Sequence, residues 1–314
     1  MTLSTLVHYR NLLKEHTPGD VSAVIRDHAG HALHLVQEQK IQFSELTQQL
    51  VYDYQEIFQS FSNFTNTIND IQQQLRALIN EQEPEYLAES HRLYREEFVH
   101  DSNEYMLHRQ IELSKDAVRY IHSRIKLYGD WRYAGLIIRP GLESWIHHMV
   151  GCDPLYLVDH NRELLNPVLD QFNRQYQNRL RKYTVDDLTN NEFLPFLPDN
   201  QFGFCLAYNY FNFKPIEVIK VYLVEIYNKL KPGGTVAFTF NNCDYAPGVK
   251  LVEKKFMCYT PGTLIMSLAD DIGYDVVQTY QIDSACTWIE LKKPGALSSL
   301  RGGQSLARIV AKSK

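Results

Sequence analysis

Polar side chains that could bind a ligand follow several short apolar runs in the second half of the chain. They are Asp159, Asp186, Asp187, Asn209, Tyr210 and Asn212. If the apolar runs are parallel strands, their carboxyl ends line one crevice, where open α/β sheets bind nucleotide-like ligands. A carboxylate there can accept hydrogen bonds from ribose hydroxyls, and an amide or phenol can position a substrate amine or hydroxyl. Asn209, Tyr210 and Asn212 are therefore the catalytic candidates.

Each of these residues also has a purely structural interpretation. Asp159 could cap the helix that follows its strand, and Asp186 with Asp187 could form an ordinary turn. The asparagines could hold a loop through side-chain hydrogen bonds. Further polar residues, Asn241, Asn242, Asp244 and Tyr245, end or follow the strand at 235–241 and would face the same crevice, but no histidine or lysine forms a pair with them. The sequence therefore assigns no general base.

The elements that would position these residues alternate between strand and helix from Tyr133 onward. The expected strands cover residues 134–138, 155–159, 183–185, 202–208 and 235–241, and the expected helices cover 142–150, 162–181, 215–230 and 261–272. Apolar strands separated by helices predict a mostly parallel sheet covered on both faces. Residues 275–282 and 285–291 are expected to add an antiparallel hairpin. The predicted fold class is α/β: a doubly wound sheet closed by that hairpin and preceded by a long all-α region.

Two motifs carry a resemblance to a known family. The segment 153–159, DPLYLVD, resembles the second strand of the class I S-adenosylmethionine-dependent methyltransferases, with its terminal acid. The segment 230–236, LKPGGTV, is similar to the turn before their fifth strand. The resemblance covers about residues 131–294 and implies a Rossmann-like fold with S-adenosylmethionine as cofactor. The cofactor-binding residues that it implies are Gly141, Asp159, Asp186 and Asp187.

The first motif departs from the family pattern, in which an acid in the strand precedes Gly-x-Gly-x-Gly. Glycines there let the backbone approach the ligand closely. In the segment 136–143, LIIRPGLE, Ile137 replaces the acid, Arg139 and Glu143 replace glycines, and only Gly141 remains. An ion pair between Arg139 and Glu143 would plug the site. We therefore expect S-adenosylmethionine to bind weakly or not at all.

Two functions follow from these observations. A methyltransferase would hold the methyl donor in line with an acceptor, and catalysis would come mainly from positioning. The alternative is a catalytically inactive structural or assembly protein, such as a part of a phage particle, because a fold can persist without its chemistry. Asp159 and the LKPGG motif favour the enzyme, whereas the altered glycine loop and the helical N-terminal half favour the alternative.

The N-terminal half has the heptad pattern of a coiled coil. Its apolar residues recur in alternating steps of three and four, with one extra step of four. They are Phe43, Leu46, Leu50, Tyr54, Ile57, Phe61, Phe64, Ile68, Ile71, Leu75 and Leu78. Aromatic seam residues favour a homotrimer through residues 41–79. An intrachain hairpin with a second helix from Tyr86 to about Lys126 is the alternative, with a break at Glu83 and Pro84.

Four regions result: a helix and coiled coil at 1–82, connecting helices at 83–130, the methyltransferase-like domain at 131–294 and a basic tail at 295–314. The tail could contact a partner or stay solvated.

The net charge of −5 argues against general nucleic-acid binding. His28, His31 and His34 lack the spacing of a metal site, and no metal is expected. Without a signal peptide or membrane span, we expect a cytoplasmic protein, or one in the host cytoplasm or virion if phage-encoded. Scattered cysteines are expected to be reduced and buried.

Overall fold

The computed structural model describes residues 2–16, 45–98, 113–140, 145–187 and 190–297. Gly141, Glu143, Phe43 and the histidines at 28, 31 and 34 lie outside these ranges. The chain forms two compact units, residues 1–83 and 84–314. No helix in the described ranges is long and apolar enough to cross a membrane.

The C-terminal unit contains a seven-stranded sheet in the order β3-β2-β1-β4-β5-β7-β6. The strands are β1 (Ala134–Ile138), β2 (Leu155–Asp159), β3 (Leu180–Thr184), β4 (Phe202–Ala207), β5 (Leu230–Asn241), β6 (Asp275–Gln281) and β7 (Cys286–Lys292). The strands β1 to β5 pair in parallel, and β7 pairs antiparallel with both β5 and β6. The predicted mostly parallel sheet with an antiparallel closing pair is confirmed.

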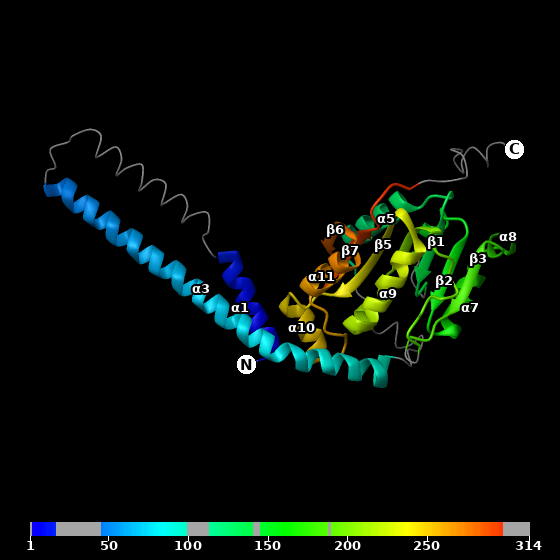
Figure 1. Ribbon diagram of the computed structural model, residues 1–314, viewed down its shortest axis with the longest axis horizontal. Coiled ribbons are helices and arrows are strands. Elements are labelled where there is room, and N and C mark those ends of the chain that lie inside the picture. Colours follow the sequence, from blue (N-terminus) through cyan, green and yellow to red (C-terminus); the bar gives the residue numbers. More distant parts are fainter. Residues whose placement is uncertain (1, 17–44, 99–112, 141–144, 188–189, 298–314) are drawn as a thin grey trace. The chain divides into compact units, whose positions relative to one another are not determined.

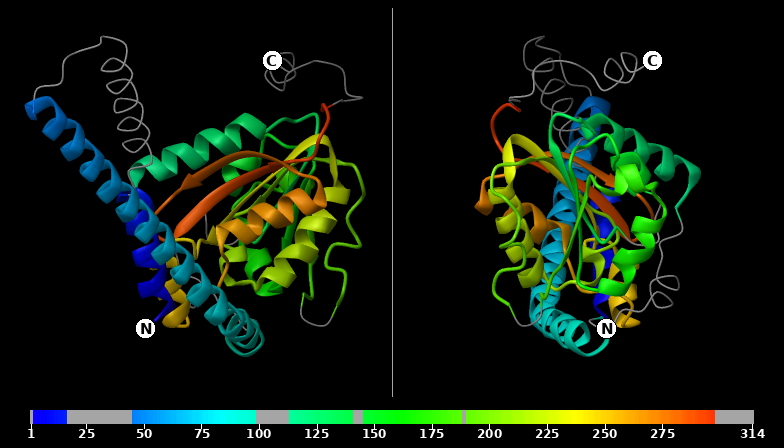
Figure 2. Two further views of the ribbon diagram at one scale, coloured as in Figure 1. Left: turned by 60° about the vertical axis from the view of Figure 1, so that its left-hand side comes forward. Right: turned by 90° about the vertical axis from the view of Figure 1, so that its right-hand side faces the viewer.

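Helices cover both faces of this sheet (Figures 1 and 2). One core packs α5 (Lys115–Tyr128), α6 (Ile146–Met149) and α7 (Arg162–Asp170) against it. The other core packs α9 (Ile216–Lys229) and α11 (Gly262–Ile272). In β1, Leu136 and Ile138 belong to one core and Ile137 to the other, because successive strand side chains point to opposite faces. The remaining helices of this unit include α8 (Arg174–Gln177) and α10 (Ala246–Glu253).

The single helix expected at 162–181 is wrong. The chain leaves α7 at Gln171, and Asn173 starts the short α8 by accepting a hydrogen bond from the Tyr176 backbone at 2.8 Å. Leu180 already pairs with Leu155, so β3 begins before the predicted residue 183. Local capping and sheet pairing therefore outweigh the helical periodicity.

The LKPGG segment lies inside β5 rather than in a turn before it. The register with β4 jumps between the pairs Phe202–Leu230 and Phe204–Thr235, so the glycines occupy a bulge. Gly233 has φ of 80°, a conformation that favours glycine. All five cysteines are free and buried, as predicted.

The helix α3 (Glu45–Leu93) runs through the predicted break, with Pro84 inside it. A proline removes one helical hydrogen bond, but the following turns gain burial in the C-terminal unit, where Ser90 and Leu93 are fully buried. A short π-helix, η1 (Tyr94–Phe98), follows directly. In the N-terminal unit, α1 (Leu3–His16) runs beside α3 (Figures 1 and 2).

Candidate functional site

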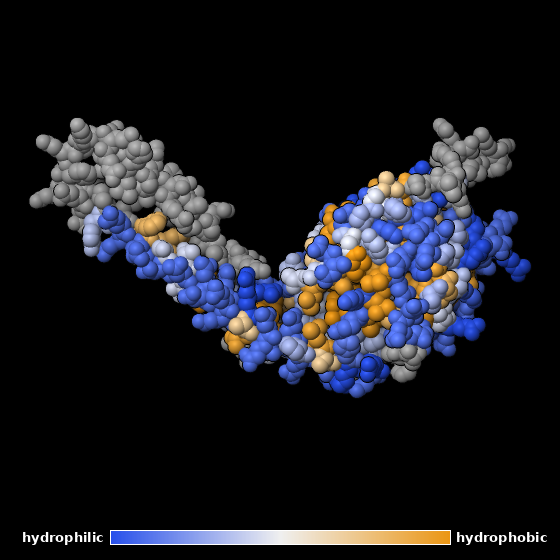
Figure 3. All heavy atoms as spheres, viewed as in Figure 1, coloured by the Kyte–Doolittle hydropathy of each residue, from blue (hydrophilic) through white to orange (hydrophobic). Residues whose placement is uncertain are grey.

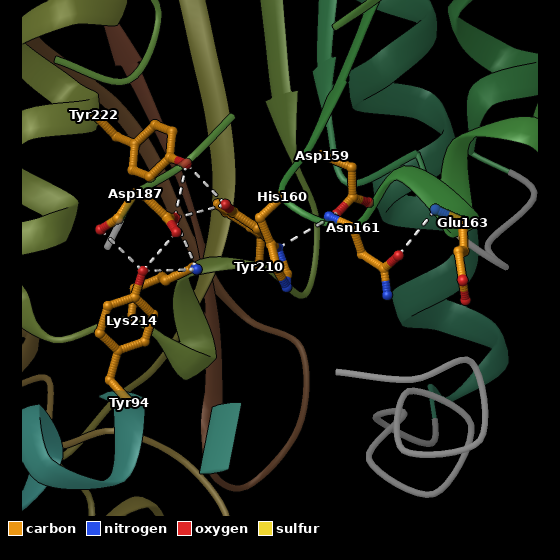
Figure 4. A network of polar contacts seen from close by, with 9 residues as sticks. All are labelled: Tyr94, Asp159, His160, Asn161, Glu163, Asp187, Tyr210, Lys214 and Tyr222. Atoms are coloured by element: carbon orange, nitrogen blue, oxygen red, sulfur yellow. Dashed lines mark hydrogen bonds and ion pairs between the residues drawn. The ribbon is translucent and has the colours of Figure 1, made fainter. Parts of the chain in front are cut away.

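The candidate site lies at the carboxyl ends of β1, β2 and β4. The strand order reverses between β1 and β4, because β2 and β3 extend to one side of β1 and β5 to the other. In open α/β sheets, ligands bind at such a switch point. Figure 4 shows most of the polar residues that gather there, although it does not draw Arg139. We call Arg139, Asp159, His160, Asp187, Tyr210 and Lys214 the crevice cluster.

Asp187 is the centre of a buried hydrogen-bond network (Figure 4). Its Oδ1 accepts from the Tyr94 hydroxyl at 2.6 Å. Its Oδ2 accepts from the hydroxyls of Tyr210 at 2.9 Å and Tyr222 at 2.8 Å, and lies 2.7 Å from Lys214 Nζ. These partners come from η1, the loop after β4, α9 and the residue after η2 (Phe211–Phe213).

Lys214 keeps this carboxylate ionised. Its side chain is 2% exposed, and its Nζ lies over the rings of Tyr94 and Tyr210 at 4.5 and 4.7 Å from their centroids. Burial alone would raise the pKa of Asp187. The charge and hydrogen bond of Lys214, with the hydrogen bond of Tyr94, outweigh burial and lower that pKa. The pair is therefore a buried carboxylate and ammonium that compensate each other.

Arg139 follows β1 at the position where the methyltransferase resemblance places a glycine. Its φ is 56°, in the left-handed region that favours glycine. The side chain is nevertheless 4% exposed, with its guanidinium 5.8 Å from the ring centroid of Tyr210 and 5.4 Å from that of Phe213. The turn thus keeps a glycine-like backbone while a long cation occupies the space beside it.

Asp159 and His160 complete the cluster at the end of β2. Asp159 is fully buried, and its Oδ1 accepts from the Asn161 backbone at 3.0 Å. Asn161, not Asp159, caps α7, by accepting from the Glu163 backbone at 2.9 Å. Burial lowers the pKa of His160 to about 3, aided by the charges of Lys214 and Arg139. The imidazole is therefore neutral at physiological pH.

The catalytic candidates after β4 take part in internal hydrogen bonds. The Asn209 backbone donates to Thr239 Oγ1 at 2.7 Å, and that hydroxyl donates to Asn212 Oδ1 at 2.9 Å. Asn212 Nδ2 lies 3.1 Å from Cys286 Sγ. The buried Asn209 Oδ1 has no hydrogen-bond partner within the described ranges. Because this oxygen is also inaccessible to solvent, a ligand donor could reach it only after the surrounding side chains moved.

Among the predicted site residues that the structure describes, Asp159, Asp187 and Tyr210 lie at the switch point, whereas Asp186 is exposed. Asn209 is linked through Thr239 Oγ1 to Asn212. Asn212 lies against β5 and β7 through Thr239 and Cys286. Within the described ranges, no three His, Cys, Asp or Glu side chains gather as a metal site would require.

Sequence reasoning missed several members of the network. Tyr94 is 93 residues from Asp187, and neither it nor Tyr222 has a motif that marks it. His160 directly follows the predicted strand 155–159 and Lys214 directly precedes the predicted helix 215–230, and these positions were the available signal. Only the tertiary contacts reveal that they converge.

No protein-family model matches the sequence, and no curated protein matches it. Solved structures of similar fold include a methyltransferase dependent on S-adenosylmethionine from Aquifex aeolicus, 12% identical, covering 58% of this chain and 100% of that chain, with a TM-score of 0.39. The N-methyltransferase NodS from Bradyrhizobium japonicum WM9, in complex with S-adenosylhomocysteine, is 13% identical over 66% of this chain and 98% of that chain, with a TM-score of 0.43.

Another similar structure is the [4+2]-cyclase SpnF, 13% identical over 59% of this chain and 84% of that chain, with a TM-score of 0.47. Such low identities and TM-scores assign no activity to this chain.

The residues at the switch point do not fit S-adenosylmethionine in this arrangement. A nucleoside needs the backbone after β1 to be accessible and a carboxylate with free oxygens. Here Arg139 is buried beside Tyr210, Asp159 is inaccessible to solvent, and both oxygens of Asp187 already accept hydrogen bonds from side chains. The donor would have to displace these groups.

Proposed function

We propose that the C-terminal unit is a methyltransferase-like domain whose crevice is occupied by its own side chains, and that the chain acts as a catalytically inactive assembly protein. The observation that carries this proposal is the buried Asp187–Lys214 pair, at 2.7 Å, with three tyrosine hydroxyls around the carboxylate. Breaking such a pair leaves an uncompensated charge, at about 3–5 kcal/mol. A ligand would have to supply that free energy before it gained affinity.

Arg139 adds a second barrier. Its side chain packs against Tyr210 and Phe213, next to the backbone that a nucleoside would approach. A cation there also disfavours the positively charged sulfonium of S-adenosylmethionine. Arg139 and the network around Asp187, which share Tyr210, therefore support the same conclusion.

Titration calorimetry of the full chain tests this proposal. We expect little heat with S-adenosylmethionine or S-adenosylhomocysteine at concentrations up to about 1 mM. The double variant Arg139→Gly with Tyr94→Ala removes the cation beside the turn and one hydrogen-bond donor to Asp187. We expect its affinity for S-adenosylmethionine to rise at least about tenfold.

Tyr86→Ala is the matched control. Tyr86 lies in α3, which directly precedes the η1 residue Tyr94, but its hydroxyl donates to the exposed Glu253 and its ring lies tilted against that of Tyr259. This variant loosens the segment without opening the crevice, and we expect no gain in affinity. Binding of the donor by the unmodified chain at micromolar concentration would refute the proposal.

A methyltransferase is the second candidate function. The favouring observation is Asn209, whose buried Oδ1 has no hydrogen-bond partner within the described ranges. An amide oxygen in this place can accept a hydrogen bond from a substrate amine or hydroxyl. If the unmodified chain binds the donor, Asp159→Ala should weaken that binding by about tenfold, the loss of a hydrogen bond to a charged group. Loss of methyl transfer in Asn209→Ala at unchanged donor affinity would then support the enzyme.

A further inference from the structure

The heptad seam of α3 is buried on one side and exposed on the other. Ile68 and Leu75, in one set of seam positions, are only 7% and 9% exposed. The other set consists of Ile57, Phe64, Ile71 and Leu78, which are 61%, 54%, 40% and 43% exposed. We call this second set the outer stripe. Among the described residues of the N-terminal unit, therefore, one half of the seam from Ile57 to Leu78 is covered and the other half is exposed.

The outer stripe has the geometry of a helix interface. Its members are spaced seven residues apart, so they form one continuous line along a helix that winds around a partner. Figure 3 shows apolar atoms interrupting the hydrophilic surface of α3. Scattered single apolar residues need no explanation, but a line of large ones at this period is typical of the interface with another helix.

A hollow at one end of the stripe matches the shape that such a partner needs. It has a volume of about 510 Å³ and is lined by Ile57, Ser60, Phe61 and Phe64, with Asp53 and Glu56 at its border. The first four residues are related as i, i+3, i+4 and i+7. Sets of four residues on one helix form the holes into which the seam side chains of a facing helix insert.

The flanking side chains indicate that the partner is a second copy of this chain. Between residues 60 and 79, the positions on either side of the seam hold Ser60, Thr67 and Gln74 on one side and Thr65, Gln72 and Ile79 on the other; the first side continues to Asp53 and Glu81 beyond this range. Charged residues at these positions would select a partner of opposite charge and repel a like copy. Over this central range, which includes Phe64 and Ile71, the uncharged flanks impose no such penalty on self-association, so the apolar stripe determines the pairing there.

We propose that the outer stripe joins copies of this chain, with the stripe of one α3 packed on that of another. The buried half of the seam stays within each chain, beside α1. This differs from the sequence expectation that the whole seam serves either an intermolecular coil or a hairpin with the segment after Tyr86. A second copy of the chain is thus the partner in the assembly function proposed above, and this pairing does not depend on whether the crevice binds a ligand.

Sedimentation velocity of the full chain and of Phe64→Asp with Ile71→Asp tests this inference. We expect the unmodified chain to sediment at a multiple of 36.6 kDa, threefold for the trimer that the aromatic seam favours. The double variant should sediment as a monomer with unchanged helical circular dichroism, because its side chains are exposed in the single chain. The control Asn66→Asp with Gln73→Asp adds the same charge to exposed positions off the stripe and should keep the oligomer.

Cysteine cross-linking provides a readout that does not depend on the stability of the aspartate variants. Oxidation should link copies of Ile71→Cys into a covalent dimer, because residue 71 lies in the outer stripe, and should leave Gln73→Cys unlinked, because residue 73 lies off it. The five native cysteines are buried and should not react. A monomeric unmodified chain, an oligomer that survives Phe64→Asp with Ile71→Asp, or equal linking of both cysteine variants would each overturn the inference. None of these outcomes would affect the proposal for the crevice, which calorimetry tests separately.

Discussion

At the residue scale, the charge of Asp187 is balanced inside the protein rather than by solvent. We expect Lys214→Met to lower the free energy of unfolding by about 3–5 kcal/mol, because it leaves a buried carboxylate without its cation. Asp187→Asn should also destabilise, and the double variant should cost less than the sum of the two, since no unpaired charge remains. Urea denaturation of the full chain measures all three.

Lys229→Met is the control for this prediction. Lys229 pairs with Asp199 at 2.7 Å, but Asp199 is 65% exposed, so we expect a loss of only about 0–1 kcal/mol. If Lys214→Met proved as mild as this control, the crevice pair would not hold the network together.

His160 makes the stability of the C-terminal unit depend on pH. Its pKa is about 3 in the folded protein and near 6.5 without burial, so the unfolded chain binds this proton more readily. The stabilisation is complete above about pH 6.5 and is lost as the pH falls toward about 3. Between pH 6 and 4, we expect His160→Gln to reduce the slope of unfolding free energy against pH by up to about 1.4 kcal/mol per pH unit. An unchanged slope would mean that the ring is accessible to solvent in the folded state.

At the element scale, the buried carboxylate of Glu290 in β7 joins α5 to the sheet through hydrogen bonds. Glu290 of β7 accepts from Arg124 Nε at 2.7 Å, Tyr128 at 2.6 Å and Trp288 Nε1 at 2.8 Å. We expect Glu290→Gln to lower the free energy of unfolding by about 1.5–3 kcal/mol, because it weakens charge-assisted hydrogen bonds. Asp275→Asn on the exposed strand β6 should change stability by less than about 0.5 kcal/mol. Equal effects in chemical denaturation would contradict this role for Glu290.

The strands were predictable because their apolar runs coincide with burial on both faces. The runs at 134–138 and 155–159 match β1 and β2 to the residue. The start of β3 was not predictable in this way, because its pattern is one buried residue followed by mainly exposed ones, and pairing with β2 decides it. Likewise, the helix through Pro84 depends on burial of Ser90 and Leu93. The sequence around Pro84 does not reveal that burial, because it arises from tertiary contacts.

The candidate site was predictable only where strand ends define it. Asp159 lies at the end of β2 as expected from position alone. Tyr94 and Tyr222 come from helices, and their hydroxyls meet Asp187 across 93 and 35 residues of sequence. Such convergence is a property of the tertiary fold, so motif reading assigned Asp187 a ligand role without its internal partners. That ligand role remains a prediction.

At the scale of the whole molecule, a closed crevice predicts that the methyl donor hardly stabilises the protein. A ligand that binds only the folded state stabilises it by RT ln(1 + [L]/Kd), which at about 1 mM is about 0.4 kcal/mol for a Kd of 1 mM and about 4 kcal/mol for a Kd of 1 μM. We therefore expect S-adenosylmethionine to raise the Tm by less than about 2 °C. Calorimetric scans with adenosine at the same concentration control for non-specific effects, and a donor-specific rise of about 8 °C or more would be incompatible with closure.

The left-handed backbone at Arg139 also has a consequence at the level of the gene. Every arginine codon becomes a glycine codon when its first base changes to guanine. The residue that fills the turn after β1 is therefore one point mutation from the residue that this backbone conformation favours. A library of single-base variants will therefore contain the chain with glycine at that turn, which is a starting point for the selection of nucleoside binding.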